Sequence, residues 1–221
     1  PSCPVCPFRS QVLSKAERED NLTFLDRMTP KVLRKYQKKG IFTINQLSYL
    51  FRPRRTRRRG AHASTAFSFE LQSLALRTKK IYLHHTPSVP SHDVELFLDI
   101  EGLPDRDFQY LIGVVVCSGT SVRCHSFWAD SPGDEAGVFQ SLLTLSADYP
   151  MAPIYHYGSY EPKALDRAEK KHGLELTRVR ERLVNANSLI YGKVYFPSHS
   201  NSLKALGAIV GATWSTADAT G

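Results

Sequence analysis

The chain has 221 residues, of which 42% are hydrophobic, with 13 Gly and 13 Pro. This length and composition exclude a disordered protein and favour one good-sized globular domain with a smaller one. No apolar stretch approaches the roughly 18 residues of a membrane span, and no signal peptide stands at the start, so we expect no membrane partner. Four Cys are too few for a disulfide scaffold, which favours a reducing, cytoplasmic environment.

The formal net charge of +8 is unevenly distributed along the chain. Residues 1–60 contain 15 Lys/Arg and 4 Asp/Glu, whereas residues 61–221 contain 14 and 17. The densest run holds six arginines: Arg52, Arg54, Arg55, Arg57, Arg58 and Arg59. A run of this density attracts phosphate, and it predicts nucleic-acid binding; the alternative is a solvated linker.

Two cysteines near the start, Cys3 and Cys6, have a spacing that can ligate a metal or an iron–sulfur cluster. One pair supplies only two of the four thiolates that a cluster needs, and we expect no iron–sulfur cluster in this chain. The sequence begins at Pro1 without Met, and we expect it to be part of a longer protein. Residues 1–20 would then be the tail of an upstream domain.

Residues 21–60 have the pattern of short helices. Thr29 is a predicted helix N-cap, and Pro30 follows it at the first helical position. Gly40 is predicted to end that helix, and Thr43 to cap the next. Two helices joined by a short turn resemble a helix–hairpin–helix unit, which binds nucleic-acid backbone through turn amides. The alternative is a plain helical hairpin that serves as a packing module.

Residues 61–92 form a predicted connecting segment, and residues 93–221 form the second predicted domain. Its expected strands are 94–100, 109–117, 122–128 and 154–157, and its expected helices are 134–147, 161–172, one near 176–184, and 203–210. The continuous apolar strand 109–117 is expected to be buried on both faces. Three antiparallel strands, helix, strand and helix is the order of an RNase H-like core. The predicted fold class is therefore α+β, an RNase H-like core preceded by a small all-helical module.

Two carboxylates stand at the far end of the first of these strands. Asp99 and Glu101 are two residues apart, so they point to the same face of the strand. Like charges this close raise each other's pKa unless a cation lies between them. Mg²⁺ or Mn²⁺ prefers such oxygen ligands, and two ions can activate water against a phosphodiester. Taken alone, the pair could equally be surface acids at a strand exit.

Three stretches, the first of which contains Asp99 and Glu101, carry a family resemblance. The stretches FLDIEG, HYGSYE and YFPSHSNSLKALGAIVGATW resemble the RNase H-like domain of the DEDD exonuclease superfamily, in the YprB-type variety of predicted RecB-like nucleases. The resemblance covers roughly residues 93–221. It implies that Asp99, Glu101 and Glu161 are metal ligands and catalytic residues. The cysteines and residues 20–55 are also similar to the middle of those proteins.

The sequence departs from that family's pattern at three places. The last catalytic Asp is expected beyond Gly221, since Asp218 precedes the expected helix. Val12 stands where a third Cys is typical, and Asn185 stands where such domains often carry Asp, so Asn185 is given no catalytic role. Lys204 near the start of the last expected helix is a candidate phosphate contact, with a surface lysine as the alternative.

Trp128 and Trp214 are expected to pack in the core, with base stacking as the alternative. The sequence as a whole predicts an exonuclease-like, metal-dependent nuclease of DNA or RNA that uses Mg²⁺ or Mn²⁺ in a two-metal site. The first alternative is a non-catalytic nucleic-acid-binding fragment with an incomplete acidic site. The second is a partner-docking domain, which would not bind Mn²⁺ at Asp99 and Glu101.

Overall fold

The computed structural model describes residues 9–52 and 67–213. These residues divide into two compact units. One unit contains residues 9–52, 67–87 and 190–213, and the other contains residues 88–189. The predicted domain 93–221 and the second unit differ beyond residue 189, because residues 190–213 group with the front of the chain. Within the described residues, no helix is both long enough and apolar enough to cross a bilayer.

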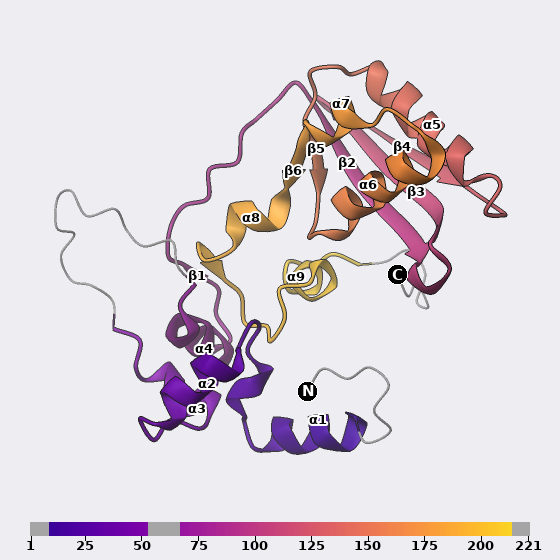
Figure 1. Cartoon of the computed structure of the whole chain (residues 1–221). Coiled ribbons are helices and arrows are strands. Elements are labelled where there is room, and N and C mark those ends of the chain that lie inside the picture. The colour runs from indigo at the N-terminus through magenta and orange to yellow at the C-terminus, as the bar shows by residue number, and fades with distance from the viewer. Residues whose placement is uncertain (1–8, 53–66, 214–221) are drawn as a thin grey trace. The chain divides into compact units, whose positions relative to one another are not determined.

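The second unit is built on a five-stranded sheet, which Figure 1 shows in its upper part. Its strand order is β4-β3-β2-β5-β6. β2 pairs antiparallel with β3, and β3 pairs antiparallel with β4. β5 runs parallel to β2, and β6 runs parallel to β5. The strands are β2 (Val94–Leu103), β3 (Phe108–Ser118), β4 (Ser121–Trp128), β5 (Ile154–His156) and β6 (Leu183–Asn185).

The antiparallel strands follow from alternation in the sequence. Leu96, Leu98 and Ile100 of β2 are all buried, and the residues between them lie on the opposite face. A tight turn at Gly119, with φ +57°, joins β3 to β4. In β3, buried residues alternate with half-buried ones along most of the strand. The prediction that both faces of β3 are buried was therefore wrong for one face.

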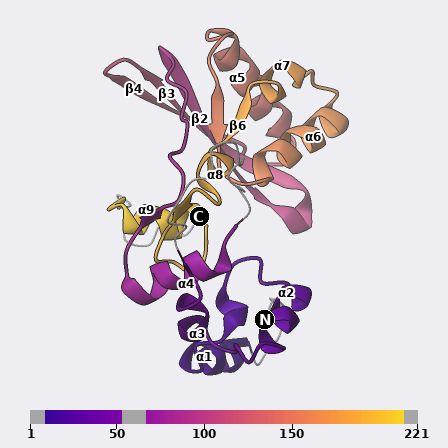
Figure 2. The same cartoon turned by 90° about the vertical axis from the view of Figure 1, so that its left-hand side faces the viewer.

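Three helices lie on one side of this sheet (Figure 2). They are α5 (Glu135–Ala147), α6 (Tyr160–His172) and α7 (Thr177–Arg180). Apolar side chains of all three helices form one buried cluster with the strands, including Phe139, Leu165 and Val179. The predicted fold class is confirmed: the unit is a mixed α+β structure with the strand order of an RNase H-like core, preceded by helices.

A buried carboxylate joins α5 to α6 and to the start of β3. Glu135 is fully buried, and it accepts hydrogen bonds from the Gln109 amide (2.8 Å), Lys171 Nζ (2.7 Å) and His172 Nε2 (3.0 Å). Lys171 Nζ also donates to the Asp107 carbonyl. Burial alone would raise the pKa of Glu135, but the hydrogen bonds outweigh it and lower that pKa.

The first unit contains the predicted helical hairpin. Its helices are α1 (Arg9–Arg18), α2 (Pro30–Gln37), α3 (Ile44–Ser48), α4 (Phe69–Thr78) and α9 (Leu203–Ile209), with the 3-10 turn η1 (Leu22–Phe24). Two short strands, β1 (Tyr82–Leu83) and β7 (Val194–Tyr195), pair antiparallel. This pairing joins residues 190–213 to the front of the chain. The predicted caps Thr29 and Thr43 both accept a hydrogen bond from the first turn of their helix.

Two further structural predictions were wrong. Residues 176–184 were expected to be one helix, but α7 ends at Arg180, and Leu183 begins strand β6, which is followed by α8 (Ala186–Ile190). Trp128 was expected in the core, but it is 62% exposed on β4, where it stacks on Tyr110. Trp214, Cys3 and Cys6 lie outside the described residues.

Candidate active site

Asp99 and Glu101 occupy the last part of β2. They alternate with the buried residues Leu98 and Ile100, so both carboxylates lie on the face of the sheet opposite the helix-packed core. The pairing between β2 and β3 shifts register between Glu101 and Gly102. This irregularity stands at the strand end where the two carboxylates lie.

Glu161 reaches the same edge of the sheet from another element. β5 runs parallel to β2, so both strands deliver their carboxyl ends to one edge. Glu161 follows β5 in the first turn of α6, where the helix dipole favours a negative charge. It is 4% exposed, and its Oε2 lies 3.3 Å from Nδ1 of His156, which is also buried. His156 therefore restrains the Glu161 side chain.

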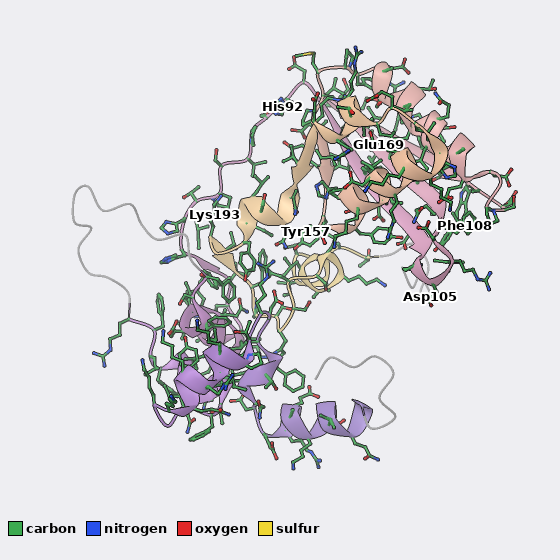
Figure 3. All side chains as sticks on the ribbon, viewed as in Figure 1. His92, Asp105, Phe108, Tyr157, Glu169 and Lys193 are labelled. Carbon is green, nitrogen blue, oxygen red and sulfur yellow. The ribbon has the colours of Figure 1, made fainter. Side chains whose placement is uncertain are left out.

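The three predicted carboxylates line one pocket. Its volume is about 340 Å³, and the remaining lining residues are Ile100, Gly102, Pro104 and Tyr160. Asp105 and Phe108, labelled in Figure 3, belong to the turn and the strand start that follow Pro104. The pocket thus joins the end of β2 to the start of α6, as a site made from sequence-distant acids requires.

The absence of a side chain at Gly102 allows Tyr160 to pack closely against β2 in the wall of this pocket. A Cβ atom at residue 102 would lie 2.5 Å from the Tyr160 hydroxyl and 2.8 Å from the Phe108 carbonyl oxygen. The Tyr160 hydroxyl therefore packs directly against the backbone of β2. Its oxygen is buried and has no hydrogen-bond partner among the described residues. The Arg167 guanidinium lies 5.5 Å from the centre of the Tyr160 ring.

The electrostatics of the pocket show that two of its acids interact. Partial burial raises the pKa of Asp99, and the negative charge of Glu161 raises it further. A hydrogen bond from the Ile100 backbone opposes these two effects and does not outweigh them. Asp99 and Glu161 come from different elements, so this repulsion exists only in the folded chain. A bound cation would relieve it.

The comparisons with known proteins agree with this geometry. A family model described as the RNase H superfamily matches residues 96–221, which is more than half of the chain. The chain belongs to the RNase H superfamily. Searches of curated proteins and of solved structures found no match. Membership in the RNase H superfamily indicates a nuclease-like domain that acts on nucleic acid.

Asn185 holds the loop that precedes Glu161, a role that the sequence did not predict. Its side chain accepts a hydrogen bond from the Gly158 amide (3.2 Å) and donates one to the Gly158 carbonyl (2.8 Å). The same Oδ1 also accepts from the Asn187 amide (3.0 Å). Gly158 has φ +99°, a conformation that favours glycine. A carboxylate at residue 185 could not donate to the Gly158 carbonyl, so these contacts require the amide.

The pocket fits a divalent ion by the chemistry of its donors. Carboxylate oxygens are the ligands that Mg²⁺ and Mn²⁺ prefer, and Mg²⁺ commonly binds one or two carboxylates and keeps several waters. The repulsion between Asp99 and Glu161 is an independent reason why a cation would bind here. No group of three or more acid, His or Cys side chains stands in metal-binding proximity within the part of the chain that the structure describes.

The predicted phosphate contacts lie elsewhere. Arg52 is exposed at the end of the first described stretch, and Lys204 is exposed in the first turn of α9. Arg54, Arg55, Arg57, Arg58 and Arg59 lie outside the described residues. The roles of Arg52 and Lys204 remain predictions.

The turn of the helical hairpin differs from a turn that binds phosphate through its amides. Every backbone amide from residue 38 to residue 47 donates a hydrogen bond within the chain. Gln46 Oε1 accepts from Phe42 and Thr43, which completes a capping box. At the start of α3, the Asp20 carboxylate accepts from the Asn45 amide (2.7 Å). An internal carboxylate thus occupies the place of an external anion, which favours the packing-module alternative.

Proposed function

We propose that this chain is the nucleic-acid-cleaving part of a metal-dependent nuclease that hydrolyses phosphodiester bonds of DNA or RNA. The observation that carries the proposal is that Asp99, Glu101 and Glu161, from two distant segments, line one pocket in an RNase H superfamily domain. Proteins of this superfamily typically use divalent metal ions. The family resemblance further favours an exonuclease-like reaction.

The proposed roles follow from what each side chain contacts. Asp99, Glu101 and Glu161 would hold Mg²⁺ or Mn²⁺ with their carboxylate oxygens. The ion would neutralise phosphate charge and activate water. His156 restrains Glu161 through the 3.3 Å contact between Nδ1 and Oε2. The Tyr160 hydroxyl, a buried donor without a partner among the described residues, would donate to a phosphate oxygen of the bound strand.

The pocket is an open depression between the end of β2 and the start of α6 and is lined by acids. Nucleic acid would therefore need cations elsewhere on the chain to bind. The proposed contacts with the phosphate backbone are Arg52, Arg54, Arg55, Arg57, Arg58, Arg59 and Lys204. Neutralising the arginines at 54, 55, 57 and 58 should weaken binding and flatten its dependence on salt, because fewer counterions are released.

The test of the proposed function compares two variants of one strand. Asp99→Asn removes a proposed ligand, whereas Glu95→Gln removes a charge from the same strand face four residues away and outside the pocket lining. Mn²⁺ binding by calorimetry and cleavage of labelled DNA and RNA oligonucleotides should both fall at least tenfold in Asp99→Asn alone. Equal Mn²⁺ binding by the two variants would refute the metal site.

The second candidate function is a nucleic-acid-binding domain that does not cleave. It is favoured by one observation: within the described residues, no three potential ligands stand close enough together to hold a metal. A chain that binds oligonucleotides but shows no Mn²⁺ binding and no cleavage would support this candidate over the nuclease.

A further inference from the structure

The outer face of α2 carries only positive charge. Lys31, Arg34, Lys35 and Lys38 recur at the spacing of a single helix face, and Lys39 follows directly. All five side chains are exposed. The segment from Pro30 to Gly40 contains no acidic residue. The result is a set of five exposed cations, three on α2 (Lys31, Arg34 and Lys35), one at its C-cap (Lys38) and one directly after it (Lys39), here called the α2 basic face.

No acid neutralises the α2 basic face within the described part of the chain. None of the ion pairs among these residues includes any of the five cations. On α1, by contrast, Lys15 lies 3.8 Å from Glu19. Like charges four residues apart destabilise an isolated helix by about 0.2–0.5 kcal/mol per pair, and Lys31 with Lys35 and Arg34 with Lys38 form two such pairs. An anionic partner would remove this repulsion.

The other side of α2 is not available for insertion into a membrane. Tyr36 is buried, and Val32 and Leu33 pack against the same apolar cluster of the first unit. A helix that lies on a membrane needs a free apolar face to enter the acyl chains. Since the apolar face of α2 is used inside the protein, only its charged side chains are available to a partner.

The spacing of the cations matches a regular polyanion. At 1.5 Å per residue, the seven steps from Lys31 to Lys38 extend over roughly 10 Å. Successive phosphates of one DNA strand rise about 3.4 Å along the helix axis, so this row spans about three of them. The amides of the adjoining turn are all used within the chain. Contact with phosphates would therefore be through the charged side chains, and contacts to phosphate carry no information about base sequence.

We propose that the α2 basic face binds the sugar–phosphate backbone of a nucleic acid strand, without regard to its base sequence. The proposal rests on the proposed function, since it supplies the substrate contact of that nuclease. It assigns the contact to α2 itself, in addition to the arginine run at residues 52–59. It also assigns recognition to side-chain charge and not to the amides of the hairpin turn.

The experiment compares two triple variants of the full chain that lose the same charge. One is Lys31→Gln, Lys35→Gln and Lys38→Gln on the α2 basic face. The control is Lys15→Gln, Lys80→Gln and Lys170→Gln, three exposed lysines on separate parts of the chain. Binding of a fluorescein-labelled 20-mer, single-stranded or duplex, is measured by anisotropy over a series of salt concentrations. Circular dichroism verifies the fold of each variant.

The α2 variant should reduce the magnitude of the log Kd against log salt slope by about two to three, with Kd about 100-fold higher at 0.1 M salt. The control should change the slope by less than about one. The proposal is supported if, for either oligonucleotide, the α2 variant loses more affinity and more salt slope than the control variant does. Equal slopes for the two variants on both probes would overturn it, as would a chain that binds neither probe.

A small substrate separates this proposal from the proposed function. Hydrolysis of bis(p-nitrophenyl) phosphate with Mn²⁺ needs the acidic pocket but no extended strand. The α2 variant should hydrolyse it at the rate of the unchanged chain. If the unchanged chain does not hydrolyse it, the proposed function fails, while the anisotropy slopes still decide whether α2 binds nucleic acid.

Discussion

Replacing Gly102 by alanine tests the geometry of the pocket wall. The new Cβ would stand 2.5 Å from the Tyr160 hydroxyl and 2.8 Å from the Phe108 carbonyl oxygen, well inside ordinary contact distance. The tyrosine can rotate away, but the carbonyl belongs to the paired strand β3 and cannot move without disturbing the sheet. The substitution should therefore move Tyr160 out of the pocket and strain the pairing of β2 with β3.

The magnitude follows from two opposing effects. Inserting a methyl group into a packed site typically costs 1–3 kcal/mol, whereas replacing glycine inside a strand gains roughly 0.5–1 kcal/mol. The net loss for Gly102→Ala is up to about 2.5 kcal/mol, or up to roughly 10 °C in Tm for a chain of this size. Because Tyr160 lines the pocket, metal-dependent cleavage should fall further than the loss of stability explains.

Gly113→Ala is the matched control. Gly113 lies on β3 opposite Asp99, and a Cβ there would find its nearest neighbour, the Asp99 carbonyl oxygen, at 3.9 Å. The free energy of unfolding of Gly113→Ala should stay the same or rise by up to about 1 kcal/mol. The assay is thermal unfolding of both variants followed by circular dichroism, together with cleavage of an oligonucleotide. Equal Tm values for the two variants would refute the close packing of Tyr160 on Gly102.

Three further variants test the neighbouring contacts. Without metal, Asp99→Asn should raise Tm at neutral pH, because a raised carboxyl pKa makes the charge of Asp99 unfavourable in the folded state; calorimetry checks the sign. Lys171→Met should destabilise the chain by about 1–3 kcal/mol at neutral pH. The pKa of Glu135 is lowered, so its stabilising charge is lost as pH falls through that pKa. Urea titrations in acid should therefore show a smaller difference in the free energy of unfolding between Lys171→Met and the unchanged chain. Asn185→Asp should weaken Mn²⁺ binding measured by calorimetry, because the donor to Gly158 is lost; tighter binding would show that residue 185 is a ligand position.

Local periodicity explains which parts of the site could be predicted. The common face of Asp99 and Glu101 follows from the alternation of β2, which is visible in the sequence. Strand β6 has only three residues, too few for a periodic pattern, and so it was mistaken for part of a helix. With β6 missed, the contact of Asn185 with Gly158 could not be foreseen, because it depends on β6 lying beside β5.

Charge could be predicted from composition, but its arrangement could not. The sequence indicated a basic front half, and the densest run drew attention to residues 52–59. That the lysines of α2 share one exposed face depends on where the helix begins and on which side packs inward. Likewise, Asp20 appeared as one of four acids in a basic segment, and only the fold brings its carboxylate to the first turn of α3.

The positions of the three proposed ligands depend on different levels of structure, so a variant can displace one carboxylate and leave the other two in place. Asp99 and Glu101 share a face through strand geometry alone, so a change elsewhere in the fold leaves their relation intact. The place of Glu161 depends on the parallel pairing of β5 with β2, on the loop held by Asn185 and on the contact with His156. Weakening that loop would therefore separate Glu161 from Asp99 without removing any carboxylate. Such a variant should lose metal affinity while the pKa of Asp99 falls, since one of the two causes that raise it is the charge of Glu161.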